Sequence, residues 1–216
     1  MWVLKLGGSL YRTPELAPWL TALGALSVPL VVVPGGGPFA DTVRQAQRDW
    51  SLSEAAAHRM AVLGMQQMAY LLCDRQSRFQ CVDTLESVAD ALQAGKVPVW
   101  LPDRLLAEAS DIECGWEVTS DSLAAWLASR LEAQGLVLVK SAEFEPTPQS
   151  VTQLQHGGIL DEAFHRYAPA APTWLIQRRH HRKLPALLEG RIDDLSGCLF
   201  VQNGAVDQPG YAGIGG

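Results

Sequence analysis

The chain has 216 residues, of which 48% are hydrophobic, and a formal net charge of −6. This length allows one large domain or two small ones, with ample apolar content for a core. The negative charge argues against general binding to nucleic acids or anionic membranes, and we see no apolar run long enough to span a bilayer. An apolar segment starts at the first residue without a charged leader, so we expect a cytoplasmic protein.

Four cysteines are scattered without a Cys-x-x-Cys pair, at Cys73, Cys81, Cys114 and Cys198. We expect small buried thiols rather than disulfides or metal ligands, which fits a reducing compartment. The sequence also shows no carboxylate cage for a metal ion of the protein's own.

In the first nine residues, an apolar run containing Lys5 leads directly into Gly7-Gly8-Ser9. This pattern predicts a buried strand followed by a tight turn. Glycines let successive backbone N–H groups face an anion, and Lys5 lies where its charge could reach the same anion. Phosphate binding is one interpretation. An ordinary turn after a strand with a solvated lysine is the other.

A second glycine turn follows a second predicted strand. Residues 28–33 form an apolar, β-branched run, typical of a strand buried on both faces, and Pro34-Gly35-Gly36-Gly37-Pro38 comes directly after it. A helix that opens at Pro14 would separate the two strands. The two turns would then lie side by side at the carboxyl ends of parallel strands, where open α/β sheets bind ligands. This suggests a donor phosphate on one turn and an acceptor on the other.

Two helices are expected after the triple glycine, at 39–49 and 53–72. The second is apolar or small on nearly every face, so we expect it to be largely buried or at a subunit contact. Together with seven tryptophans, this predicts a homo-oligomer, a symmetric dimer or higher. His58 lies on this helix, and a packed histidine is one interpretation of it.

A third polar group is Thr119-Ser120-Asp121, which precedes a predicted helix at 123–131. Thr119 or Ser120 can cap that helix. Asp121 has two interpretations. It is either a first-turn acid that complements the helix dipole, or a carboxylate aimed at Lys5 that keeps the ammonium charged and oriented.

The strand predicted at 136–140 ends in a second lysine, Lys140. Two lysines and an aspartate around glycine turns suit phosphoryl transfer, where reactants are aligned and charge on the transferring oxygens is stabilised. Further strands are predicted at 97–101, 173–176 and 198–201. Because strands alternate with helices, we predict an α/β fold with a mainly parallel open sheet, followed by a loose tail at 206–216.

These motifs, in this order, resemble the amino acid kinase family, which includes acetylglutamate, aspartate, uridylate, carbamate and isopentenyl phosphate kinases. The matching pieces are Lys5-Leu6-Gly7-Gly8-Ser9, Pro34-Gly35-Gly36-Gly37, Thr119-Ser120-Asp121 and Leu136-Val137-Leu138-Val139-Lys140. The resemblance implies one three-layer α/β/α sandwich over 1–216, with an acceptor and phosphoryl-transfer half at about 1–135 and a nucleotide half at about 136–205. It also implies that ATP is the donor and that Mg²⁺ arrives with the nucleotide.

The resemblance further implies roles for individual residues. Lys5, Asp121 and Lys140 would form the catalytic group, in which Asp121 organises the lysines. Phosphates would be held by Gly7, Gly8, Ser9, Ser120, Ser141 and Lys183, and the acceptor would contact Gly35, Gly36, Gly37, His58 and Thr119. The second interpretation of His58 arises here, because isopentenyl phosphate kinases are similar in carrying a phosphate-binding histidine on this helix.

The nucleotide half departs from the family pattern. Many members carry Gly-Gly-Met and a downstream lysine that touches the donor phosphates, whereas His156-Gly157-Gly158 is followed by no lysine before Lys183. Either Lys140 or the basic run 178–183 replaces that lysine, or ATP binding is weak or lost. A solvated helix start is the other interpretation of the basic run.

Within the family, residues 116–122 and the short length are most similar to the small kinases of methanofuran-type cofactor synthesis. Those enzymes phosphorylate an aminomethylfuran-methyl phosphate to its diphosphate, in methanogens and methylotrophic bacteria. We therefore expect a kinase that uses Mg-ATP and a small acceptor, a phosphate monoester. Two alternatives stay open: a kinase with a carboxylate or carbamate acceptor, and a non-catalytic protein that binds or stores a nucleotide or an oxyanion.

Overall fold

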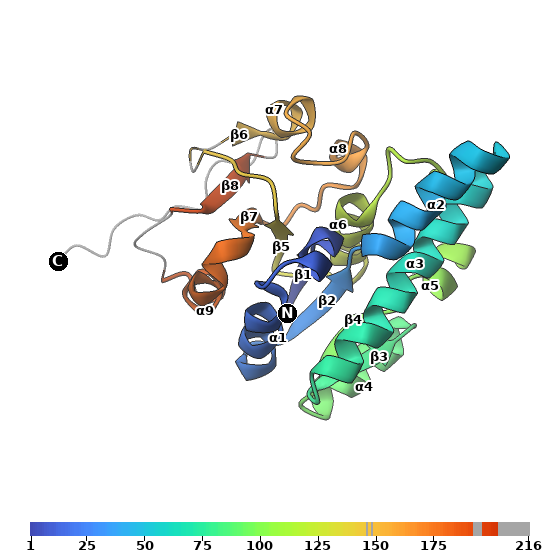
Figure 1. Cartoon of the computed structure of the whole chain (residues 1–216). Coiled ribbons are helices and arrows are strands. Elements are labelled where there is room, and N and C mark those ends of the chain that lie inside the picture. The colour runs from blue at the N-terminus through green and yellow to red at the C-terminus, as the bar shows by residue number, and fades with distance from the viewer. Residues whose placement is uncertain (146, 148, 192–195, 203–216) are drawn as a thin grey trace.

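A mainly parallel sheet forms the centre of the computed structural model, which describes residues 1–145, 147, 149–191 and 196–202 (Figure 1). The predicted tail at 206–216 lies outside the described residues. Within them the sheet has the order β3-β4-β2-β1-β5-β7-β8-β6, and only β7 and β8 pair antiparallel. The strands are β1 (Trp2–Leu6), β2 (Leu30–Pro34), β3 (Phe79–Val82), β4 (Val97–Trp100), β5 (Gly135–Lys140), β6 (Gln149–Ser150), β7 (Thr173–Gln177) and β8 (Cys198–Gln202).

Helices cover both faces of the sheet. They are α1 (Leu16–Ala25), α2 (Gly37–Trp50), α3 (Glu54–Arg75), α4 (Leu85–Gln93), α5 (Asp103–Glu108), α6 (Ser120–Arg130), α7 (Val151–His156), α8 (Phe164–Tyr167) and α9 (Leu184–Leu188), with the 3-10 helices η1 (Gly8–Arg12) and η2 (Arg178–Lys183). Across the described part of the chain, none of them is long and apolar enough to cross a membrane.

The two faces of β1 belong to two separate cores. Val3 packs into a core with the buried side chains of α4, α6 and α8, whereas Leu4 packs with those of α1, α9 and the second half of α3. Alternate residues of a strand face opposite sides of the sheet, so an all-buried strand needs a helix layer on each side. This confirms the predicted three-layer α/β/α sandwich with a mainly parallel sheet.

Strand β3 was not predicted. It lies at one edge of the sheet and buries only its terminal residues, Phe79 and Val82, so it lacks the continuous apolar run of the central strands. The expectation of four buried thiols is also wrong. Only Cys198 is buried, because Cys73 and Cys81 lie half-buried where the end of α3 meets this edge strand, and Cys114 is exposed on a loop.

The register of three neighbouring strands brings the sequence motifs to one edge of the sheet. In β1, Leu6 lies opposite Pro34 of β2 on one side and opposite Val139 of β5 on the other. The residues that follow these three positions are the two glycine turns and Lys140. The motifs therefore meet because parallel strands end together.

The two glycine turns lie side by side, as predicted, and the structure adds that their backbones are in direct contact. The N–H of Gly35 donates to the carbonyl of Leu6 at 2.9 Å. A Cβ added to Gly8 would lie 2.2 Å from the nitrogen of Gly37, and one added to Gly35 would lie 2.4 Å from the nitrogen of Gly8. Only glycine allows this approach.

Helix α3 is buried on one side only. It runs beside α2 along the β2 and β4 part of the sheet (Figure 1). Met60, Leu63 and Tyr70 are 39%, 40% and 59% exposed, although all three are apolar or aromatic. A single chain therefore leaves an apolar strip of α3 uncovered.

Gly8→Ala is expected to lower the free energy of unfolding by about 1–3 kcal/mol, the usual range for overpacking, because its methyl group would collide with the backbone of Gly37. Gly157→Ala is the matched control, since a Cβ there meets its nearest atom at 3.4 Å and φ is −77°. Chemical denaturation of both variants checks this. Equal midpoints for Gly8→Ala and wild type would contradict the contact between the turns.

Candidate active site

One carboxylate bridges two lysines at the edge of the sheet where the motifs meet. The Nζ of Lys5 lies 2.9 Å from Oδ1 of Asp121, and the Nζ of Lys140 donates to Oδ2 of the same carboxylate. The three side chains are 9%, 12% and 3% exposed for Lys5, Lys140 and Asp121, so the group is nearly buried. The hypothesis that Asp121 is aimed at Lys5 agrees with this geometry, which adds Lys140 as a second partner.

Strand pairing explains why these residues meet. Lys5 lies opposite Leu138 of β5, so Lys140 lies two residues further along on the same face of the sheet. Helix α6 packs across β1 and β5 on that face. Because Asp121 is in the first turn of α6, its carboxylate reaches both lysines while also lying at the positive end of the helix dipole.

The shared carboxylate stays ionised at neutral pH. Burial alone raises the pKa of Asp121, but Lys140 and Lys5 outweigh burial and bring this pKa down to about 2. Burial lowers the pKa of Lys140 below the usual lysine range, because Asp121 offsets that effect only in part and Lys5 adds to it. Two ammonium groups on one carboxylate leave a positive excess, which suits an anionic ligand.

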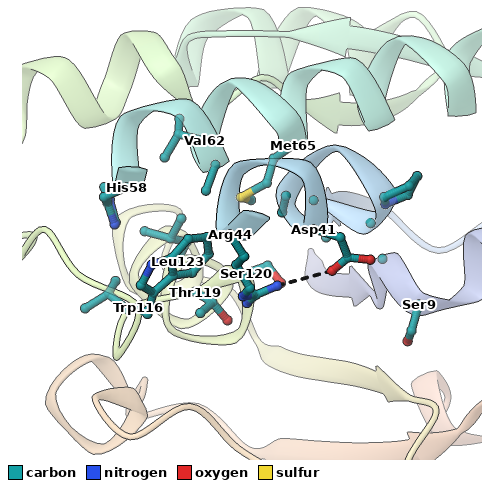
Figure 2. Close-up of a pocket in the computed structure, with 18 of the residues that line it drawn as sticks. Ser9, Asp41, Arg44, His58, Val62, Met65, Trp116, Thr119, Ser120 and Leu123 are labelled. Atoms are coloured by element: carbon teal, nitrogen blue, oxygen red, sulfur yellow. Dashed lines mark hydrogen bonds and ion pairs between the residues drawn. The ribbon is translucent and has the colours of Figure 1, made fainter. Parts of the chain in front are cut away.

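Lys5 also lines a cavity of about 270 Å³, and other residues of the cavity wall are labelled in Figure 2. Figure 2 shows His58 and Trp116 at one end and Ser9 at the other, with Asp41 and Arg44 between them. Many of the predicted site residues line it: Lys5, Gly8, Ser9, Gly35, Gly36, Gly37, His58, Thr119 and Ser120.

Three other predicted residues, Gly7, Ser141 and Lys183, do not line the cavity. Gly7 precedes η1 and packs against the carbonyl of Val139. Ser141 follows β5, and its hydroxyl is 2.7 Å from that of Ser9, so two predicted phosphate-binding residues join the two halves of the chain. Lys183 lies elsewhere, at the end of η2.

His58 is both packed and at the cavity. It is buried, and its Nδ1 lies 3.1 Å from the carbonyl oxygen and 3.3 Å from the backbone nitrogen of Gly115. Because the backbone of Gly115 engages Nδ1, Nε2 is the ring nitrogen that a ligand in the cavity could reach.

The expected cap of α6 is wrong. Neither Thr119 nor Ser120 caps the helix through its own side chain. The hydroxyl of Thr119 instead donates to Asp161 at 2.6 Å, and the Asp161 carboxylate accepts from the N–H groups of Thr119 and Ser122, both at 3.0 Å. Asp161, which is far from α6 in the sequence, therefore caps this helix in place of Thr119 or Ser120.

Sequence reasoning missed several residues of the cavity, namely Arg12, Asp41, Arg44 and Trp116. The guanidinium of Arg44 lies 4.2 Å from the centroid of the Trp116 ring and pairs with Asp41 at 3.4 Å. One signal was available. Gly37, Asp41 and Arg44 follow an i, i+4, i+7 spacing, which places them on one face of α2.

The basic run 178–183 forms η2, between β7 and α9, and contacts its surroundings. Arg178 pairs with Glu15 at 3.9 Å and Arg179 with Glu143 at 3.7 Å. The Nζ of Lys183 donates to the carbonyl and the hydroxyl of Ser196, at 2.8 and 2.6 Å. These contacts hold the run against the start of α1 and the loops that carry Glu143 and Ser196; its contact with a nucleotide stays a prediction.

No group of three or more His, Cys, Asp or Glu side chains within the described residues could hold a metal ion.

Fold and site together define a class of enzymes that transfer phosphoryl groups: a parallel sandwich with paired lysines at two glycine turns. A sequence model of the amino acid kinase family matches residues 1–143, and the chain belongs to this family. It is therefore an ATP-dependent kinase.

The chain is also similar to individual kinases. It is 26% identical to the [5-(aminomethyl)furan-3-yl]methyl phosphate kinase of Methanocaldococcus jannaschii over 147 residues. The aligned residues cover 66% of this chain and 67% of the relative. The uridylate kinase of Archaeoglobus fulgidus superposes with a TM-score of 0.65 at 16% identity, over 93% of this chain and 99% of the other. The UMP kinase of Bacillus anthracis superposes with a TM-score of 0.65 at 12% identity, over 94% of this chain and 96% of the other.

Lys5→Ala is expected to reduce turnover by roughly 10²–10³-fold, the usual cost of removing one group that stabilises charge in the transition state. If Asp121 orients Lys5, Asp121→Asn should also lower turnover sharply, and the double variant should be far less than additive. Steady-state rates and melting temperatures of the single and double variants check this.

Glu86→Gln is the control for this cycle, because Glu86 is an acid in the first turn of α4, away from the lysines. A role of Asp121 in complementing the helix dipole alone would cost about 0.3–1 kcal/mol of stability and leave turnover nearly intact. That result, or fully additive losses, would show that the ion pair does not act as a unit in catalysis.

Proposed function

We propose that this kinase transfers the terminal phosphoryl group of ATP to a small phosphate monoester and so produces a diphosphate, with an aminomethylfuran-methyl phosphate as the acceptor. The observation that carries the proposal is the carboxylate of Asp121 shared by Lys5 and Lys140, at the edge of a cavity between two glycine turns. The name of the archaeal relative supports the choice of acceptor.

The donor side fits a phosphoryl group. ATP supplies the group to be transferred, and Mg²⁺ would come with the nucleotide. Lys5 and Lys140 carry a positive excess that Asp121 only half neutralises, and the hydroxyls of Ser9 and Ser141 lie beside each other. In phosphoryl transfer the protein mainly aligns the reactants and stabilises charge on the transferring oxygens. The lysines would stabilise that charge while Asp121 keeps their ammonium groups oriented.

The donor lysine of the family pattern has a substitute in this arrangement. Lys140 ends β5 at the junction between the two halves of the chain, whereas Lys183 is engaged with Ser196. Of the two replacements considered from the sequence, Lys140 is the one supported by its position beside Lys5.

The acceptor side fits a small, flat phosphate ester. Arg12 and Arg44 line the cavity and offer guanidinium groups, which suit phosphate recognition. Trp116 and Leu123 supply apolar surface for a ring. Asp41 adds a carboxylate at the same wall, and a carboxylate can pair with the amine of an aminomethyl group.

An acceptor panel tests the proposal, with ADP release as the readout. We expect the aminomethylfuran-methyl phosphate to give the highest kcat/KM, and the same alcohol without phosphate to be turned over far more slowly, because it offers no phosphate to Arg12 and Arg44. The rate of ADP release by Lys5→Ala serves as the background for the assay. Faster turnover of a carboxylate or carbamate would replace the proposed acceptor, and ATP binding without ADP release from any acceptor would favour the non-catalytic alternative.

We further propose that the kinase is a homo-oligomer and that the exposed strip of α3 forms its contact. Met60 and Leu63 are one helical turn apart, and Tyr70 follows two turns later, so the three lie along one side of α3. A two-fold contact would bury this strip on both copies at once.

Light scattering at micromolar concentration is expected to show a dimer or higher for the wild type. Leu63→Asp should shift it toward the monomer, since a charge would be buried in the contact. Ala94→Asp is the control, because Ala94 is exposed at the end of α4. A monomeric wild type, or a Leu63→Asp variant that assembles like the wild type, would count against the contact.

A further inference from the structure

Asp161 contacts the catalytic helix from the other half of the chain. It lies between α7 and α8, beyond the residues that the family model matches. Its Oδ2 accepts hydrogen bonds from the N–H groups of Thr119 and Ser122, both at 3.0 Å, and its Oδ1 accepts one from the hydroxyl of Thr119 at 2.6 Å. Three donors from one helix start converge on this carboxylate.

These bonds supply what the start of α6 lacks. The first N–H groups of a helix have no partner within the helix, and Thr119 provides no side-chain cap. Asp161 satisfies such a donor at Ser122 and places a negative charge at the positive end of the helix dipole. Because Asp121 lies between Thr119 and Ser122 in sequence, the position of its carboxylate depends on this cap.

Asp161 also belongs to the charge balance of the site. Burial and the nearby Asp121 raise the pKa of the Asp161 carboxyl, so the site holds this second acid at an electrostatic cost. In the described residues, the charged groups that act on Lys140 are Asp121 from α6, Lys5 from β1 and Asp161 from the loop before α8. The negative charge of Asp161 raises the pKa of Lys140 and so opposes the effects of burial and Lys5.

We propose that Asp161 is a positioning residue for phosphoryl transfer: its carboxylate fixes the first turn of α6 so that Asp121 stays between Lys5 and Lys140. The inference rests on phosphoryl transfer at this site. Asp161 itself does not line the cavity, and its effect passes through α6 and the lysines.

Asp161→Asn tests this inference. The amide removes the charge and one acceptor, so we expect kcat to fall by about 10- to 100-fold, the scale of loss from small misplacements of catalytic groups, with little change in the KM for the acceptor. The loss of kcat at alkaline pH, where Lys140 gives up its proton, should also begin at lower pH, because a negative charge near Lys140 is gone. Asp161→Glu restores the negative charge, so its kcat should be lost at the same alkaline pH as in the wild type.

Ser150→Ala is the matched control. Ser150 caps α7 in the same half of the chain through a capping box with Gln153, so its loss removes a helix cap away from the lysines. For Ser150→Ala we expect a drop in melting temperature similar to that of Asp161→Asn. Its kcat, and the pH at which kcat is lost, should stay as in the wild type. If Asp161→Asn also loses only thermal stability, or raises only the KM of the acceptor, the positioning role is overturned.

A second readout does not depend on the acceptor. Competitive acetylation of the lysines across a pH series, followed by mass spectrometry, reports the titration of Lys140, with the exposed Lys96 as the internal reference. Lys140 should react at lower pH in Asp161→Asn than in wild type, while Lys96 is unchanged. An unshifted Lys140 overturns the inference, whereas failure of every acceptor in the wild type overturns only the proposed function.

Discussion

The site depends on one carboxylate shared by two lysines. Asp121 is almost completely buried, and both lysines are nearly so. Breaking a buried ion pair typically costs about 3–5 kcal/mol, since the remaining charge has no partner and little water. The three charges therefore hold one another in place. Asp121 allows two ammonium groups to lie close together despite their repulsion, and they in turn keep its pKa at about 2. This trio is left with one net positive charge, and Asp161, the second acid that acts on Lys140, does not line the cavity.

Strand order brings these charges to the glycine turns. Strands β2, β1 and β5 are parallel neighbours, so the chain delivers a glycine turn, a second glycine turn and a lysine to one edge. The turns touch through Gly8, Gly35 and Gly37, and a side chain at Gly8 or Gly35 would collide with the backbone of the facing turn. Because glycines have no side chains, the two turns leave backbone groups and space open to a ligand beside the charged side chains. Helix α6 begins at the same edge and adds the carboxylate.

Much of this arrangement could be predicted because each part lies in a short local pattern. Buried strands appear as apolar runs, the turns appear as glycines, and Lys5 and Lys140 stand out as charges in those runs. Contacts between distant segments leave no such pattern. Asp161 caps a helix that begins 41 positions before it in the chain, at Ser120, and its own neighbours show no capping pattern. Edge strand β3 was missed because it buries too little to form an apolar run.

The second half of the chain contributes differently. The family model ends at residue 143, just after Lys140 and Ser141. Beyond it, β8 runs antiparallel to β7, and Arg178 and Lys183 of the basic run contact Glu15 and Ser196. The paired lysine charges beside the glycine turns, on Lys5 and Lys140, therefore lie in the matched part. The Ser9–Ser141 contact joins the two halves of the chain, and Ser141 directly follows Lys140. The absence of the family's downstream lysine therefore does not by itself remove positive charge from this junction.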